Sequence, residues 1–264
     1  MTQIAAIGNL SVDVVAEQPP SPGGTVFFSA RTLARLGAPA RVTVSCASRD
    51  RPLFRALEEL PQPPTWRESP ETTAFRFRYT RGGRRVMRVE AVGASWSPQD
   101  ALEAVGDADW VHVGALLRTD FRHATLEALA SGRKLLVDGQ GLLRTARIGP
   151  LRRDRRLGDV LQFVTMLKLD SGEAQLLVGD TEPERLAALG VPEVLLTLGA
   201  KGAVVVTRAR IEGVPAHDVD EVGDPTGAGD TFSAAYLVAR VAGAAPLEAA
   251  RSASATAGEF LYRR

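Results

Sequence analysis

The segment Gly223-Asp-Pro-Thr-Gly-Ala-Gly-Asp-Thr-Phe232 joins a glycine-rich turn to the start of a helix. Asp224 to Thr226 favour a turn, Gly227 to Gly229 let backbone N–H groups approach a ligand, and residues 231–240 are rich in Ala and Val. Exposed N–H groups and the positive end of a helix dipole both attract anions. The segment therefore predicts an anion site, in which the negative charge of Asp230 is unexpected.

Asp230 has a chemical explanation if the anion is a phosphoryl donor. During phosphoryl transfer the attacking hydroxyl must lose its proton, and a nearby carboxylate can accept it. Asp230 would then face the hydroxyl, while the amides of Gly227, Ala228 and Gly229 hold the phosphate charge. The alternative is that Asp230 only caps the helix.

Apolar runs alternate with amphipathic segments along most of the chain. This rhythm predicts βαβ units, hence an α/β core with a parallel sheet covered by helices. The expected strands are Ile4 to Gly8, Val42 to Ala47, Trp110 to Val113, Leu135 to Asp138, Met166 to Leu169 and Val194 to Leu198, and the expected helices are Val26 to Leu36, Pro98 to Val105 and Phe121 to Ala130.

One section departs from this rhythm. Residues 73–79 alternate strictly, residues 81–83 supply a turn, and residues 84–92 return as a second strand. The first strand has an aromatic face and a basic face: Phe75, Phe77 and Tyr79 against Arg76 and Arg78. We expect this hairpin and a short strand at residues 12–16 to form a lid over the ends of the parallel strands. An edge hairpin with a solvated charged face fits the pattern equally well.

Composition limits the partners. The 264 residues carry 32 basic and 31 acidic side chains, without the basic excess of a dedicated nucleic-acid binder. The arginines and aromatics of the hairpin keep single-stranded nucleic acid as a competing hypothesis.

With no secretory signal and no apolar run of ~18 residues, we expect a cytoplasmic protein without a membrane partner. Cys46 lies in an apolar run and is expected to be a core thiol.

Several familiar sites are not supported by the sequence. It contains neither a P-loop nor a Gly-x-Gly-x-x-Gly dinucleotide fingerprint. His112, His123 and His217 have no Cys or Glu at ligand spacing, so we interpret each as a structural histidine and expect no zinc site.

The glycine-rich segment resembles the signature of the ribokinase-like, or PfkB, family of carbohydrate and nucleoside kinases. Four further segments resemble family motifs in the same order: residues 8–13, 23–24, 168–174 and 197–202. The resemblance spans nearly the whole chain. It implies one kinase domain over residues 1–264, with a three-layer α/β/α core, a mostly parallel central sheet, and a β lid from about residues 11–24 and 67–96.

The resemblance also implies a role for each matching residue. Asp230 corresponds to the catalytic base, and the anion hole corresponds to Gly227, Ala228 and Gly229. The substrate-side residues are Ser11, Asp13, Gly24 and Phe28, and the nucleotide-side residues are Lys168, Thr197, Gly199 and Gly202. Glu173 would place Mg²⁺ through water, and Asp224 matches a loop that binds a monovalent cation such as K⁺ in some members.

Three departures from the family pattern bear on the substrates. Asp170 replaces the usual Asn, and Phe28 replaces an Asn that contacts sugar hydroxyls in ribokinases, which disfavours ribose. Residues 24–30, 138–144 and 168–174 look closer to the branch that contains myo-inositol kinases. The chain ends soon after residues 253–258, where many relatives continue, so the nucleotide preference stays open.

The resemblance implies an ATP- and Mg²⁺-dependent kinase that phosphorylates a hydroxyl of a sugar or polyol, with a weak preference for an inositol-like acceptor. Two alternatives stay open: a nucleoside or sugar-phosphate kinase of the same family, and a catalytically silent sugar or nucleotide sensor. Lid strands in this family often pair between subunits, so a homodimer through the lid is a further expectation.

Overall fold

The computed structural model describes residues 3–16, 18–79, 85–217 and 225–262, and its largest element is a nine-stranded sheet. All strand pairs in this sheet are parallel except those that β13 makes with its two neighbours. The strand order is β14 (Ile211–Val214), β13 (Ala203–Thr207), β12 (Glu193–Thr197), β11 (Met166–Asp170), β9 (Lys134–Asp138), β8 (Trp110–Gly114), β1 (Ile4–Asn9), β4 (Ala40–Cys46) and β5 (Thr65–Glu68). The predicted mostly parallel sheet is confirmed.

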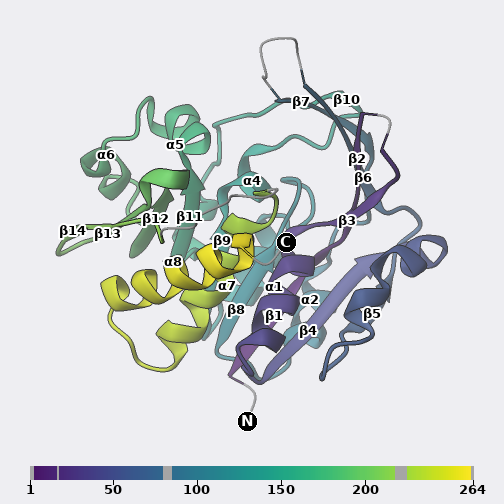
Figure 1. Ribbon diagram of the computed structural model, residues 1–264, viewed down its shortest axis with the longest axis horizontal. Coiled ribbons are helices and arrows are strands. Elements are labelled where there is room, and N and C mark those ends of the chain that lie inside the picture. The colour runs from purple at the N-terminus through teal and green to yellow at the C-terminus, as the bar shows by residue number, and fades with distance from the viewer. Residues whose placement is uncertain (1–2, 17, 80–84, 218–224, 263–264) are drawn as a thin grey trace.

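Helices cover both faces of this sheet (Figure 1). One face packs against α1 (Thr25–Arg35), α7 (Ala228–Val241) and α8 (Pro246–Tyr262), and the other against α2 (Pro98–Val105), α3 (His123–Ala130), α4 (Gly139–Leu143), α5 (Ser171–Val178) and α6 (Pro183–Ala187). Side chains alternate between the two apolar cores, since Leu136 belongs to the first and Leu135 and Val137 to the second. The three-layer α/β/α prediction is therefore confirmed.

A second, five-stranded sheet stands beyond one end of the large sheet (Figure 1). Its order is β10 (Gly149–Pro150), β7 (Arg85–Ala91), β6 (Thr73–Tyr79), β2 (Ser11–Val15) and β3 (Ser21–Gly23). We call this sheet the lid. The hairpin is thus not an edge of the large sheet. Strand β5 pairs with β4 in the large sheet, although residues 67–68 fall within the predicted lid range, and β10 joins the lid from outside that range.

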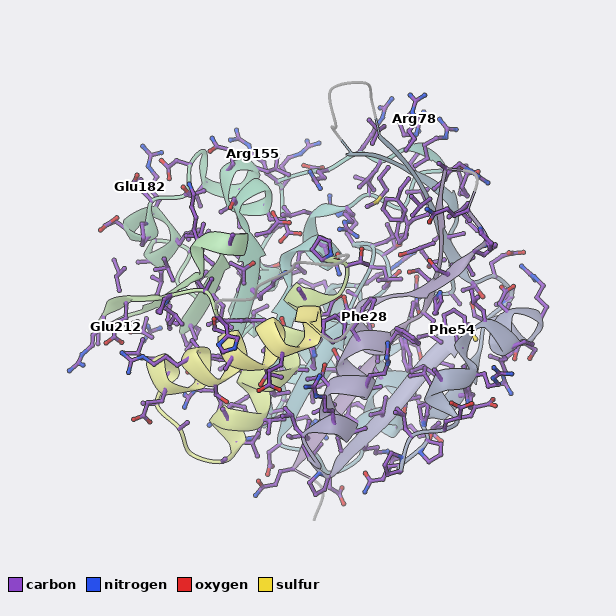
Figure 2. The ribbon with its side chains drawn as sticks, in the orientation of Figure 1. Phe28, Phe54, Arg78, Arg155, Glu182 and Glu212 are labelled. Atoms are coloured by element: carbon purple, nitrogen blue, oxygen red, sulfur yellow. The ribbon has the colours of Figure 1, made fainter. Side chains whose placement is uncertain are left out.

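The two faces of β6 have the environments that its alternation predicts. Phe75 and Phe77 are buried with Val89, whereas Arg76 and Arg78 are exposed. Figure 2 shows Arg78 at the outer rim of the molecule. The predicted turn at residues 81–83 lies outside the described residues. Phe75 and Phe77 thus face inward, and the exposed face of β6 in this part of the strand is the basic one.

The remaining elements are short connections. They are the 3-10 segments η1 (Ser48–Leu57), η2 (Val160–Phe163) and η3 (Gly199–Lys201). Cys46 ends β4 in the core, where burial raises the pKa of its thiol to about 11, so the predicted core thiol is confirmed. In the part of the chain that the structure describes, no helix is long and apolar enough to cross a membrane.

Candidate active site

A cavity of about 180 Å³ lies between the lid and the first turn of α7. It is at the carboxyl ends of the parallel strands, where open α/β sheets bind ligands. Its lining combines carboxylates, other polar groups and the apolar face of the lid: Ser11, Asp13, Gly24, Thr25, Phe28, Phe75, Phe77, Met87, Leu116, Gln140, Arg144, Pro225, Thr226, Gly227 and Asp230. The structure thus brings the predicted base and the substrate-side residues to one cavity.

The turn before α7 requires glycine for two reasons. Gly227 has a φ of 86°, which L side chains rarely adopt, and a Cβ there would lie 2.4 Å from a ring atom of Phe28. Phe28 is only 2% exposed and packs edge-on against Phe27 and Phe260. Phe28 therefore forms a rigid wall behind Gly227 and adds an apolar side chain to the cavity lining, at the position where ribokinases are expected to have Asn.

Asp230 is in the first turn of α7, after Ala228 and Gly229. Burial raises the pKa of its carboxyl, and the negative charge of Asp138 raises it further, while Lys168 and a hydrogen bond from the Thr25 hydroxyl act in the opposite direction. A carboxylate with a raised pKa is a stronger base. This environment suits a group that must take a proton from a hydroxyl.

Two cations lie near this turn. The Lys168 ammonium is 3.7 Å from a carboxylate oxygen of Asp138, and a Cβ on Gly229 would lie 2.8 Å from its nitrogen. Burial lowers the pKa of Lys168, but the surrounding carboxylates, Asp138 first, raise it above its usual value. Arg144 lines the cavity, and its Nε is buried with no hydrogen-bond partner among the described residues. An unpaired buried donor of this kind is suited to an anionic ligand.

The opposite wall of the cavity is formed by the lid, including its strand β2. The Ser11 hydroxyl donates a hydrogen bond of 2.9 Å to Asp13, and a side chain at Gly23 would overlap both groups. Leu116 completes the apolar side, held by backbone N–H groups at 116 and 117 that donate to the buried Asp120 carboxylate at 2.8 and 3.1 Å. This wall offers both hydrogen-bonding and apolar surface.

Glu173 is the residue predicted to place Mg²⁺. It forms a capping box with Asp170 at the start of α5: the Asp170 N–H donates to Glu173 (2.9 Å), and the Glu173 N–H donates to Asp170 (2.7 Å). Burial raises the pKa of Glu173. Its carboxylate keeps acceptor capacity for a metal-bound water, which fits Mg²⁺ held mainly by phosphate and water oxygens. Among the described residues, no three metal-ligating side chains cluster closely enough to hold an ion alone.

Some predicted residues do not line the cavity. Thr197 ends β12, where its hydroxyl donates to the Leu169 carbonyl at 3.2 Å. Gly202 has a φ of 89°, and a Cβ there would lie 2.1 Å from the Val214 carbonyl oxygen, so the pairing of β13 with β14 alone explains this glycine. Gly199 is in η3. Asp224 lies outside the described residues. The nucleotide and cation roles of these four stay predictions.

Three residues near the site, Arg144, Gln140 and Asp138, were given no role from the sequence. The signal was available, because all three fall in the stretch 138–144 that resembles the inositol-kinase branch. Gln140 lines the cavity and donates a hydrogen bond of 2.5 Å to Thr25. His112 is isolated in the sequence, yet the fold places its Nε2 2.8 Å from Asp138. Both are fully buried, so the structural interpretation of His112 is confirmed.

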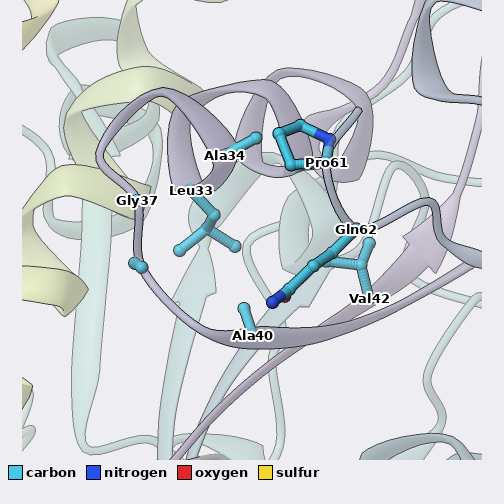
Figure 3. Close-up of a pocket in the computed structure, with 9 residues that line it drawn as sticks. Leu33, Ala34, Gly37, Ala40, Val42, Pro61 and Gln62 are labelled. Carbon is cyan, nitrogen blue, oxygen red and sulfur yellow. The ribbon is translucent and has the colours of Figure 1, made fainter. Parts of the chain in front are cut away.

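A second cavity, of about 210 Å³, shares no lining residue with the first, and its lining is drawn in Figure 3. Small and apolar residues of α1, β4 and the segment at 61–62 form it: Ala30, Leu33, Ala34, Gly37, Ala38, Ala40, Val42, Pro61 and Gln62. It contains no titratable group. The chemistry of the molecule is therefore assigned to the smaller cavity.

The fold and the site define the class of phosphotransferases that act on hydroxyl groups. A family model described as pfkB family carbohydrate kinase matches residues 66–261. The chain belongs to this family, as its motifs predict.

Individual relatives differ in how much they share. The chain is 27% identical over 206 residues to the bifunctional protein HldE of Caulobacter sp. (strain K31), covering 70% of this chain and 40% of the relative. It is 43% identical over 78 residues to a 1-phosphofructokinase of Haloferax volcanii, covering 30% of this chain and 25% of the relative. The chain thus spans less than half the length of either curated relative.

Solved structures are similar over almost the entire chain. A pyrophosphate-dependent kinase in the ribokinase family, complexed with a pyrophosphate analogue and myo-inositol, is 25% identical, with a TM-score of 0.86 and coverage of 98% of this chain and 94% of that one. A ribokinase from Thermotoga maritima is 20% identical, with a TM-score of 0.75 and coverage of 100% and 94%. The ribokinase-like fold is therefore confirmed.

Proposed function

We propose that this protein transfers a phosphoryl group to a hydroxyl of a small sugar or polyol, with Asp230 as the general base. The observation that carries the proposal is the placement of Asp230 between two unlike surroundings. One is the glycine turn at the N-terminus of α7, and the other is the wall formed by β2 and the lid. One carboxylate can thus reach the acceptor while the turn holds the donor phosphate.

In the proposed reaction the Asp230 carboxylate takes the proton of the acceptor hydroxyl. The acceptor oxygen then bonds to the terminal phosphorus of the donor, and the bond from that phosphorus to its bridging oxygen breaks. The N–H groups of Gly227 and Gly229 and the cations Lys168 and Arg144 stabilise the transferred phosphoryl group and the leaving phosphate, and the Ala228 N–H, which donates to the Pro225 carbonyl at 3.1 Å, joins them once that bond opens. A bound Mg²⁺, placed by Glu173 through water, would neutralise phosphate charge.

The acceptor is proposed to be inositol-like. Asp13, Ser11 and Gln140 supply polar contacts, while Phe28 and the lid supply apolar ones. A ring whose hydroxyls lie around its edge presents both kinds of surface. The neighbour at 25% identity was solved with myo-inositol, which supports this choice.

ATP is the donor that the family resemblance implies, with Thr197, Gly199 and Gly202 as proposed nucleotide contacts. Pyrophosphate is a second candidate, favoured by the two cations Lys168 and Arg144 and by the neighbour at 25% identity, which is a pyrophosphate-dependent kinase. A diphosphate would need none of Thr197, Gly199 and Gly202. This fits a cavity that Arg144 lines and that none of these three residues lines.

A donor assay separates these candidates. The purified protein is supplied with Mg-ATP or Mg-pyrophosphate and a panel of inositols, pentoses, hexoses and nucleosides, with fructose 1-phosphate as a phosphorylated acceptor, and the product, a monophosphate from the free acceptors or a bisphosphate from fructose 1-phosphate, is identified by mass. We expect an inositol monophosphate. Turnover of only fructose 1-phosphate or nucleosides would select the alternative kinases. Ligand-induced stabilisation without any product would indicate a sensor.

Two substitutions test the assigned groups. Asp230→Asn should lower turnover at least ~100-fold with little change in donor binding, because it removes only the base. Arg144→Met should raise the KM for the donor ~10-fold, whereas the exposed Arg147→Met serves as the matched control and should not. Near-normal turnover by Asp230→Asn would reject the assignment of the base.

A further inference from the structure

A chain of buried polar groups runs beneath α1 and α7. The Ser29 hydroxyl of α1 lies 3.0 Å from Nδ1 of His112, Nε2 of His112 lies 2.8 Å from Asp138, and the Ser233 hydroxyl of α7 donates to Asp138 at 2.9 Å. Because a carboxylate only accepts hydrogen bonds, Nε2 of His112 is the donor. These hydrogen bonds thus fix both helices to the central strands β8 and β9.

Asp138 differs from the other groups in this hydrogen-bonded network because its carboxylate also forms an ion pair with Lys168. One carboxylate oxygen accepts from Ser233 and lies 3.7 Å from the Lys168 ammonium, which is directly beneath Gly229. Burial alone would raise the pKa of Asp138, but the hydrogen bond from His112 and the charge of Lys168 hold it below its usual value. Asp138 is therefore a fixed negative charge.

Asp230 experiences both charges of this pair with opposite effects. The Asp138 carboxylate disfavours a second negative charge at Asp230, and the Lys168 ammonium favours it. If Asp138 did not hold the ammonium, the closest remaining carboxylates would compete for it, and pairing with Asp230 would make that residue a weaker base.

We propose that Asp138 is a positioning residue for the catalytic base: it anchors Lys168 beneath the glycine turn and, through its own charge, keeps Asp230 basic. This inference rests on the proposed function of Asp230. It goes beyond that function by assigning the strength of the base to a carboxylate that does not line the cavity. The hydrogen bonds from His112 and Ser233 keep Asp138 in place.

The pH dependence of Asp230 depends on charged and titratable groups from three elements and one connecting segment. They are Asp138 at the end of β9, Lys168 on β11, His112 on β8 and Arg144 after α4, and Glu173 on α5 acts on Lys168 and Arg144. Since only Asp138 and Lys168 form the ion pair next to Asp230, replacing each one alone should move the protonation of Asp230 in opposite directions.

The test measures the protonation of Asp230 in the whole protein by ¹³C-carboxyl NMR titration, with Asp230→Asn used to assign the signal. Asp138→Asn should shift the Asp230 midpoint to lower pH, because it removes a negative neighbour and frees Lys168. Lys168→Met should shift it to higher pH, because it removes a positive neighbour. This readout does not require turnover, so it stays valid even if no acceptor is phosphorylated.

Enzyme kinetics provide the second readout. For Asp138→Asn, the acid limb of the kcat/KM profile should move to lower pH and the plateau should fall roughly 10-fold, because a weaker base transfers the proton less readily. Ser233→Ala is the matched control: it loses one hydrogen bond to Asp138 and keeps the charge, so its melting temperature should fall while the acid limb stays in place.

Unchanged Asp230 midpoints in both Asp138→Asn and Lys168→Met would overturn the inference, as would shifts in the same direction. If Asp138→Asn does not fold, Asp138→Ser, which also removes the charge, takes its place with the same expected direction, and an unchanged or raised Asp230 midpoint in it overturns the inference. The proposed function fails separately, through absence of turnover in the unmodified protein.

Discussion

The two ends of helix α7 each bury a group of charged residues, and the two groups are built differently. At the C-terminal end, Arg240 donates to both oxygens of Glu193, at 2.6 and 3.1 Å, and Tyr236 donates to the same carboxylate at 2.6 Å. At the N-terminal end, the carboxylates of Asp138, Asp230 and Glu173 lie around Lys168, and Arg144 has a buried Nε without a partner among the described residues.

The difference separates a structural ionic network from a functional one. At Glu193, a bidentate ion pair and a phenol satisfy the buried carboxylate, so folding alone completes the network. At Asp230, burial and like charge oppose ionisation, and a cation donor is left available. A negatively charged ligand that brings its own cation would satisfy the charged groups at this end of α7. Charged groups that a ligand rather than folding satisfies are the pattern expected at an active site.

Breaking the C-terminal network should have the largest effect on stability. Arg240→Met leaves Glu193 buried without its cation, so we expect the free energy of unfolding to fall by about 3–5 kcal/mol. Turnover of the folded protein should not change, because Glu193 begins β12 at the end of the sheet opposite the cavity. Urea unfolding and kcat measured on the same sample check both statements.

A double variant tests whether charge is the cause of that loss. Glu193→Gln combined with Arg240→Met removes the unpaired charge and keeps an acceptor for Tyr236, so it should recover most of the lost stability. Equal losses in the single and double variants would show that packing of Arg240 near the Trp110 ring, 5.9 Å away, accounts for the effect instead.

Two glycines allow the same comparison for the backbone, with an intermediate effect. Gly227 precedes α7 and Gly243 follows it, with φ of 86° and 92°, but only Gly227 has atoms within 4 Å of an added Cβ. Gly243→Ala should cost about 1 kcal/mol of stability and leave turnover unchanged. Gly227→Ala should cost more and lower kcat at least ~10-fold, since its Cβ displaces the turn or Phe28. Equal kcat values in the two variants would contradict a role for the turn.

The sequence predicted the charged group at the N-terminal end of α7 better than the group at its C-terminal end. Gly227, Gly229 and Asp230 form a continuous motif whose chemistry follows from residue type and spacing. The alternation of Phe75 and Phe77 likewise predicted the covered face of the lid. The order of strands could not be read from these patterns, because parallel neighbours such as β1 and β8 lie about a hundred residues apart in the sequence.

Residues joined only by folding were missed. His112 and Asp138 are 26 positions apart, and Glu193 and Arg240 are 47 apart, so no local pattern connects them. Arg144 was visible within a resembling stretch, but the burial of its unpaired Nε follows from how the folded chain packs around it, including Phe75 of the lid. Burial and partner geometry are properties of the assembled chain, which explains why Asp230 was singled out from the sequence while the buried charges around it were not.

The smallest predicted effect has the opposite sign to that of Arg240→Met. Because burial and Asp138 raise the pKa of Asp230 in the folded state, the native protein binds this proton more tightly than the unfolded chain, and ionisation of Asp230 destabilises the fold as pH rises. Asp230→Asn lacks this titration. Relative to the unmodified protein it should gain roughly 1 kcal/mol between pH 4 and pH 8, within the range of substitutions that relieve functional strain. Urea unfolding of both proteins at the two pH values measures this change.

Constant differences between the proteins, such as the altered hydrogen bond with Thr25, cancel in the comparison. A relative gain by the unmodified protein at pH 8 would mean that Lys168 outweighs Asp138 at Asp230, and the N-terminal group would then be a satisfied network like that of Glu193.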